Sequence, residues 1–290
     1  MSFSRRAFVA GIAGGCASLW TAAARADSKL IRIIYPFGAG GSGDILTRFV
    51  AQKIGEALGR PSIVENRTGA DGRIGIQSVK SAPADGSTLL ISSAPSMTYM
   101  PLLHKTPGYD AGADFEPISQ LGRYEFCIVA ANDTGIKSVA DLAKWVKANP
   151  TKATYSVPAV GSIPHFVGVE LSKSFGVEMV RAPYRGSAAG LNDIIGGQLP
   201  LGLMPLSDAI LQYRAGSVRM IAVMSRTRSP FVPEVETLME AGYPIEAEAW
   251  FGLWAPARTP PETIQAIDRI VVTHWRNRRF ASASWRWGSS

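Results

Sequence analysis

The residues with the clearest capacity for chemistry lie in a glycine-rich turn, GAGGSGD, at residues 38–44. The turn follows the apolar run LIRIIYPF and opens a helical pattern, with Ser42 or Asp44 as the predicted N-cap. Glycine lets the backbone approach a ligand closely, and the unpaired amides at the start of a helix point toward an anion. The turn therefore predicts an anion-binding site at the end of a strand.

One candidate anion is the pyrophosphate of a dinucleotide. Gly38, Gly40 and Gly43 satisfy the G-x-G-x-x-G fingerprint. Glu65 lies about 20 residues further on, where an acid that binds the ribose is expected. Against this, a Pro-Phe pair separates the strand from the first glycine, and a second turn, ENRTGADG, begins at Glu65 itself. An exported NAD(P)-dependent oxidoreductase stays open as the alternative to a protein that binds a small carboxylate.

Two further turns carry small polar residues that suit an anion: SSAPS at residues 92–96 and SVPAVGSIPH at residues 156–165. Two or three such turns on opposite domains would hold a carboxylate without a buried arginine, although one alone is more often plain loop. The three histidines lack metal-ligand spacing, and the chain has no G-x-S-x-G elbow. We therefore expect a binding protein without catalytic residues, metal or cofactor.

The net charge of +7 belongs to the two ends of the chain. Without the three arginines of residues 1–26 and the five of residues 269–290, 22 basic residues face 23 acidic ones. A basic face on the folded body is therefore not expected, and this argues against a nucleic-acid partner.

The first 26 residues predict an export signal. Two arginines, Arg5 and Arg6, precede an apolar run that ends in an A-x-A cleavage site after Ala26. The adjacent arginines favour the twin-arginine route, with an ordinary Sec signal as an equal alternative. A lipoprotein signal at Cys16 is less favoured, because Ala13 stands where a larger aliphatic residue is usual. We expect a periplasmic protein.

Cleavage after Ala26 would leave Cys127 as the single cysteine, so no intramolecular disulfide is expected. Cys127 lies in the apolar run EFCIVAAN, which predicts a small buried core residue rather than a nucleophile. No segment after the signal reaches about 18 uninterrupted apolar residues, so no membrane span is expected.

The remaining chain alternates strand patterns with helical patterns. LIRIIYPF, PSIVEN and STLLISSA predict strands separated by helices, and a second unit of the same kind begins near residue 125 with EFCIVAAN. Strand–helix alternation is typical of α/β domains with mostly parallel sheets flanked by helices. Two such domains predict a ligand site between the carboxyl ends of their strands.

These motifs, in this order, resemble the Bug-type (TctC-like) extracytoplasmic solute receptors of tripartite tricarboxylate transporters. PFGAGGSGD resembles the family's PFPAGGSTD-like turn, and VENRTGADGRIG is similar to VENRPGAGGxIG. APYRGSAAGLNDIIGGQLPL resembles VPYKGxxPALxDLLGGQVD, and AGSVRMIAVMSRTRSPFVPEVETLMEAGYP resembles a further family run. The resemblance covers most of residues 30–256.

The resemblance implies a two-domain periplasmic binding-protein fold that closes on a small carboxylate like a Venus flytrap. It implies a monomer that serves the permease subunits of such a transporter, or a sensor kinase. We expect domain 1 at residues 27–124, domain 2 at residues 125–225, and a return to domain 1 at residues 226–290. By position, the implied ligand-binding residues are Phe37, Gly38, Gly40, Gly41, Ser42, Asp44, Ser93, Ser96, Ser156, Gly161, Ser162, His165, Tyr184, Arg185 and Gly186.

Two departures from the family pattern affect these expectations. Met204 stands where the family often has an acid that can meet a ligand's amino group, and Asp208, four residues on, is a doubtful replacement. We therefore expect a ligand without an ammonium group, such as a dicarboxylate or an aromatic carboxylate. From about residue 276 the chain ends in RNRRFASASWRWGSS, which we interpret as a truncated or aberrant tail.

Overall fold

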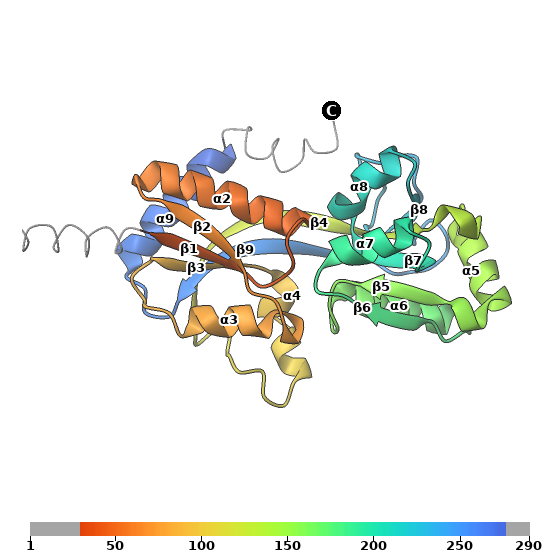
Figure 1. Ribbon diagram of the computed structural model, residues 1–290, viewed down its shortest axis with the longest axis horizontal. Helices are drawn as coiled ribbons and strands as arrows, with labels where there is room; N and C mark the ends of the chain where they lie inside the picture. Colours follow the sequence, from red (N-terminus) through yellow and green to blue (C-terminus); the bar gives the residue numbers. More distant parts are fainter. Residues whose placement is uncertain (1–29, 277–290) are drawn as a thin grey trace, which may run out of the picture.

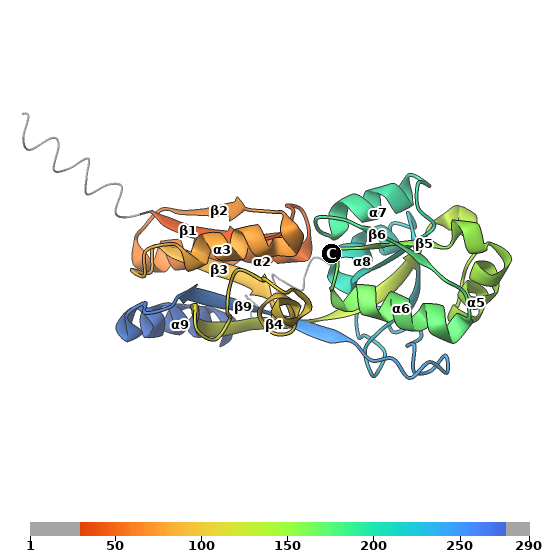
Figure 2. The ribbon, with the colours of Figure 1, turned by 90° about the horizontal axis from the view of Figure 1, so that it is seen from below.

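The computed structural model describes residues 30–276 of the 290-residue chain. Its strands are β1 (Ile31–Tyr35), β2 (Ser62–Asn66), β3 (Thr88–Ser93), β4 (Phe115–Ala130), β5 (Thr154–Val157), β6 (Val180–Pro183), β7 (Leu201–Pro205), β8 (Arg219–Val223) and β9 (Glu248–Pro256). Its α-helices are α2 (Ser42–Leu58), α3 (Arg73–Lys80), α4 (Ala94–Met97), α5 (Val139–Ala148), α6 (Ile163–Phe175), α7 (Ser187–Ile195), α8 (Leu206–Arg214) and α9 (Pro261–Arg276). Figures 1 and 2 show these elements in two groups that lie side by side.

The first half is a sheet in the order β2-β1-β3-β9-β4, covered by helices on both faces. β1 pairs in parallel with β2 and β3, whereas β9 runs antiparallel to β3 and β4. Successive side chains of β1 point to opposite faces of the sheet. Ile31 and Ile33 pack with α2 and α9 on one face, and Ile34 packs with α3 on the other. The predicted parallel strands β1, β2 and β3 are confirmed.

The second half carries β5, β6, β7 and β8 with helices α5 to α8. β5 is parallel to β6 and β7, and the last part of β4 is antiparallel to β7 and β8. Alternation again sets the two faces: Ile128 packs toward α5 and α6, whereas Cys127 and Val129 pack toward α7 and α8. Cys127 is fully buried, as predicted, and burial raises the pKa of its thiol.

A single long strand connects the two halves. β4 pairs with β9 as far as Glu125 and with β7 from Phe126 onward, so one strand belongs to both sheets. β9 lies beside it, and Figure 1 shows the two strands running from one half toward the other. Sequence reasoning found only the second part of β4, in EFCIVAAN, and missed β9.

Several expectations concern residues that the structure does not describe or test. The predicted signal peptide of residues 1–26, with Cys16, and the tail beyond residue 276 lie outside the described residues. The predicted domain boundaries stay a prediction; residues 226–247 pack on the second half, with Val232 and Leu238 in its cores. Within residues 30–276, none of the helices combines the length and apolarity needed to cross a membrane.

Candidate functional site

The glycine-rich turn between β1 and α2 lies where the two halves meet. The Gly38 amide donates a 2.8 Å hydrogen bond to the carbonyl oxygen of Arg185, which precedes α7. The Ser42 amide, in the first turn of α2, donates a 2.6 Å hydrogen bond to the Oδ1 atom of Asp208 in the first turn of α8. The turn therefore touches the second half twice through its own backbone.

Packing explains the three glycines that match the dinucleotide fingerprint. A Cβ atom on Gly38 would lie 2.6 Å from the carbonyl oxygen of Arg185, and one on Gly43 would lie 2.0 Å from the hydroxyl of Tyr35. Gly40 has a φ of +91°, a conformation that favours glycine. Each glycine is thus required by a close contact or a backbone angle of this fold, with no nucleotide involved.

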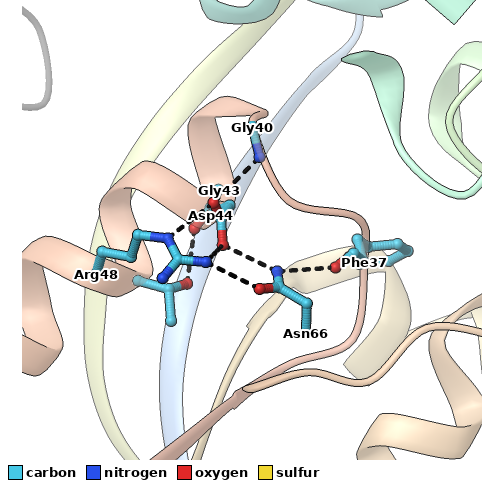
Figure 3. A network of polar contacts seen from close by, with 7 residues as sticks. Phe37, Gly40, Gly43, Asp44, Arg48 and Asn66 are labelled. Carbon is cyan, nitrogen blue, oxygen red and sulfur yellow. Dashed lines mark hydrogen bonds and ion pairs between the residues drawn. The ribbon is translucent and has the colours of Figure 1, made fainter. Parts of the chain in front are cut away.

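Asp44 organises the turn from the side of α2 (Figure 3). The residue is 3% exposed, and its carboxylate accepts hydrogen bonds from the Gly40 amide at 3.1 Å, from Arg48 at 3.0 Å and from Asn66 at 2.9 Å. Asn66 also donates to the carbonyl oxygen of Phe37. Burial by itself would raise the pKa of Asp44, but these hydrogen bonds and the Arg48 charge outweigh it and hold the pKa below its usual range.

The N-cap prediction is wrong. Gly41 is the N-cap of α2, and no side chain caps the helix start. Ser42 is the first helical residue, and its Oγ atom is buried without a hydrogen-bond partner in the described part of the chain. The Ser42 amide is therefore satisfied from outside the helix, by Asp208, whereas the Asp44 amide bonds to the carbonyl oxygen of the N-cap Gly41.

Two cavities border the turn, and Gly41, Ser42 and Asp208 line both. The smaller cavity, about 70 Å³, is lined by residues of both halves, with the serines Ser93, Ser96 and Ser162 among mostly apolar side chains. The larger cavity, about 290 Å³, is mainly apolar, with Ile45 from α2 and Ile210 from α8 on its walls. The two cavities share these lining residues and together make up the candidate site between the halves.

Eight of the residues implied by the resemblance line the smaller cavity. They are Phe37, Gly38, Gly41, Ser42, Ser93, Ser96, Ser162 and Gly186. Ser93 and Ser96 are buried, with their hydroxyl oxygens 3.2 Å apart. The structure thus brings together the three turns that the sequence placed on opposite units.

The other implied residues lie outside the smaller cavity. Gly40 lines the larger one, and Asp44 lies behind the turn. Ser156 is buried beneath α7, where a Cβ atom on Gly190 would touch it. The Tyr184 hydroxyl donates to Asp193, and Arg185 reaches the turn through its carbonyl oxygen.

Gly161 and His165 structure the loop before α6. The Gly161 amide donates a 3.0 Å hydrogen bond to the Nδ1 atom of His165, and the imidazole stacks on Phe166. Burial, followed by the Arg181 charge, lowers the pKa of His165. His165 therefore positions this loop and lines neither cavity.

Asp208 is the site residue that sequence reasoning undervalued. Met204, aligned with the family's acid, is buried in the core of the second half. β7 ends at Pro205 and α8 begins at once, so Asp208 falls in the first turn of the helix and faces α2. An acid is thus present between the halves, and Met204 no longer argues against a ligand with an ammonium group. The sequence signal was an acid in a first helical turn directly after a strand.

Aromatic side chains form the floor between the cavities. Tyr124 stacks on Phe251 with ring centroids 4.5 Å apart, and both line the two cavities. Tyr35 lies beneath the turn, where burial, followed by the Asp208 charge, raises the pKa of its hydroxyl. The floor is therefore apolar and uncharged near neutral pH.

The acid expected to bind a ribose has other partners. Glu65 makes ion pairs with Arg32 at 3.0 Å and with Arg67 at 2.7 Å. The second turn leads into a short 3-10 helix, Ala70–Gly72, and Asp71 there accepts a hydrogen bond from the Val160 amide of the other half. This turn therefore serves the contact between the halves.

Comparison with known proteins identifies the family of this chain. The model of a family described as tripartite tricarboxylate transporter family receptor (TctC) matches residues 46–283. The chain belongs to this family. It is 32% identical to the protein BugT of Bordetella pertussis over 247 residues, which cover 84% of this chain and 76% of BugT.

Two solved structures are similar to this TctC-family receptor. The periplasmic binding protein BugD is 31% identical with a TM-score of 0.84, over 89% of this chain and 87% of BugD. Rpa4515 of R. palustris, solved with adipate, is 29% identical with a TM-score of 0.79, over 89% of this chain and 94% of Rpa4515. The predicted family and the predicted periplasmic binding-protein fold are confirmed.

Replacing Gly43 by alanine will destabilise the protein by about 2 kcal/mol, because the new methyl group overlaps Tyr35. The shift of the urea unfolding midpoint measures this. Gly112→Ala is the matched control, since its Cβ would meet only one atom, at 3.5 Å. A Tyr35→Phe change in the Gly43→Ala background will recover part of the loss. Equal stability of the two glycine variants would contradict this account of the turn.

Asp44 will make the stability of the TctC-family receptor depend on pH. Its folded pKa lies below the unfolded value of about 3.9, so its carboxylate stabilises the fold above about pH 4. That contribution is lost as the pH falls through the folded pKa. The stability difference between wild type and Asp44→Asn should therefore be constant near neutral pH and shrink below about pH 4 in urea titrations. Exposed Glu178→Gln is the control, and a difference that does not shrink in acid refutes the assignment.

Proposed function

We propose that this receptor captures a small carboxylate between its two halves. The observation that carries the proposal is the 2.6 Å hydrogen bond from the Ser42 amide to the Asp208 carboxylate. The amide thus already binds one carboxylate oxygen, and the carboxylate of a ligand would accept the same hydrogen bond. The ligand-binding residues are the fifteen that the resemblance implies, with those lining the cavities in direct contact and the others holding the loops.

The two cavities suggest how the ligand lies. Its carboxylate sits at the border, near Gly41 and Ser42, and the hydroxyls of Ser93 and Ser96 line the smaller cavity beyond. The rest of the ligand extends into the larger apolar cavity. A carboxylic acid with an apolar body fits this arrangement, and the similar protein Rpa4515 was solved with adipate.

We further propose that the chain is exported to the periplasm, with cleavage after Ala26, and acts there as a monomer. It would deliver its ligand to the permease subunits of a tripartite tricarboxylate transporter or present it to a sensor kinase. Membership of the receptor family supports this role. Closure of the halves around the ligand would create the surface that such a partner recognises.

A panel of carboxylic acids will identify the ligand by thermal shift and calorimetry. Adipate, shorter dicarboxylates, aromatic carboxylates, glutamate and NAD⁺ are tested against the purified protein. A true ligand at a hundredfold excess over its Kd stabilises the fold by about 2.7 kcal/mol. Stabilisation by one or more acids, and none by NAD⁺, is expected. Stabilisation by NAD⁺ alone would refute the receptor function and favour the oxidoreductase.

Replacing Gly38 by alanine will weaken ligand binding about tenfold or more. Its Cβ would lie 2.6 Å from the backbone of Arg185, so the halves could not approach as closely. The Gly112→Ala protein, changed far from the turn, should bind as the wild type does. Calorimetry with the best acid of the panel measures both. Unchanged affinity of the Gly38→Ala protein would exclude closure at this contact.

A further inference from the structure

We propose that Asp208 is a built-in competitor that occupies, in the ligand-free receptor, the amide that the ligand carboxylate takes. This inference rests on the proposed carboxylate-binding function. It assigns to Asp208 a role in setting the affinity for the ligand. On binding, the carboxylate of the ligand replaces the carboxylate of Asp208 at the start of α2. The same bond holds the two halves together before a ligand arrives.

The geometry gives Asp208 the position of a ligand. Its Oδ1 atom accepts the Ser42 amide hydrogen from across the gap between the halves, and it lines both cavities. A Cβ atom on Gly41 would lie 3.5 Å from its Oδ2 atom, so the carboxylate lies against the backbone of the turn. The buried Ser42 Oγ, which has no partner among the described residues, is a second hydrogen-bonding group at this position.

Two acids meet this turn, and their surroundings differ. Asp44 is almost fully buried and is held by Arg48, Asn66 and the Gly40 amide, so it is a fixed part of the fold. Asp208 is only partly buried, and in the described part of the chain the Ser42 amide is its one hydrogen-bond donor and no ion pair holds it. Asp208 can therefore leave the amide by rotating its side chain, whereas Asp44 cannot.

The direction of the effect follows from a thermodynamic cycle. The bond to Ser42 lowers the free energy of the ligand-free closed protein. It is absent from the complex, because the ligand carboxylate uses the same amide. Every unit of stability that Asp208 gives to the free protein is thus subtracted from binding, and a displaced Asp208 also repels the bound anion. Removing the side chain should therefore strengthen binding.

Calorimetry with adipate, glutamate and the best acid of the panel tests the competition. Asp208→Ala should bind dicarboxylates about tenfold more tightly than the wild type, since tenfold corresponds to 1.4 kcal/mol and charge-assisted hydrogen bonds reach this size. Asp208→Asn keeps an oxygen but loses the charge, so its affinity should lie between the two. Glu178→Ala, which removes an exposed acid of the same half, should bind as the wild type does. Unchanged or weaker binding by Asp208→Ala overturns the proposal, and a loss confined to glutamate would instead make Asp208 the partner of a ligand ammonium group.

A measurement without ligand separates this inference from the proposed function. Exposed Ala57 on α2 and Ala148 at the end of α5 are changed to cysteine and spin-labelled, while native Cys127 is buried. The ligand-free wild type should give a single narrow distance distribution, and Asp208→Ala should add a second, more open population. Identical distributions overturn the role of Asp208 in closure. If no acid binds any variant, the proposed function fails, and these ligand-free distances alone decide whether Asp208 holds the halves together.

Discussion

The site depends on one physical constraint: the amides at the start of α2 need acceptors that the helix cannot supply. In this chain the Ser42 amide finds its acceptor in the other half, and two glycine amides just before the helix are held as well. Asp44 folds back onto Gly40, Arg185 offers its carbonyl oxygen to Gly38, and Asp208 reaches Ser42 from the other half. The Gly38 and Ser42 contacts thus also fix how the turn meets the second half.

The architecture lets these contacts form and break without disturbing the cores. β4 enters both sheets, and each half keeps its own hydrophobic layers on the two faces of that strand. Between the halves, hydrogen bonds that join Gly38 to Arg185, Ser42 to Asp208 and Val160 to Asp71 stand beside an aromatic contact of Tyr99 with Phe166. Most buried apolar residues therefore belong to the core of one half or the other.

Much of the fold could be predicted from the sequence because its signals are local. The strands β1, β2 and β3 and the helices between them follow from short apolar runs and helical spacing. The N-terminal part of β4 and the whole of β9 could not be found in this way. Their residues owe their conformation to pairing with strands more than a hundred residues away in the chain, and no periodic pattern in the local sequence records such partners.

The residues of the candidate site likewise fall into those that the sequence identified and one, Asp208, that it undervalued. Sequence order placed Gly38, Ser93 and Ser162 at strand ends, and the structure brings them to one cavity. Sequence reasoning undervalued Asp208 because it compared positions along the chain with the family pattern. Which residues a side chain can contact also depends on where its helix begins. The break at Pro205 starts α8 and turns an acid toward α2.

A glycine fingerprint therefore predicts a backbone whose amides can come close to an acceptor. It does not identify that acceptor, which depends on the groups that face the turn. In this receptor the facing group is the chain's own carboxylate, that of Asp208, which accepts the Ser42 amide hydrogen; this bond is the basis for proposing a carboxylate ligand.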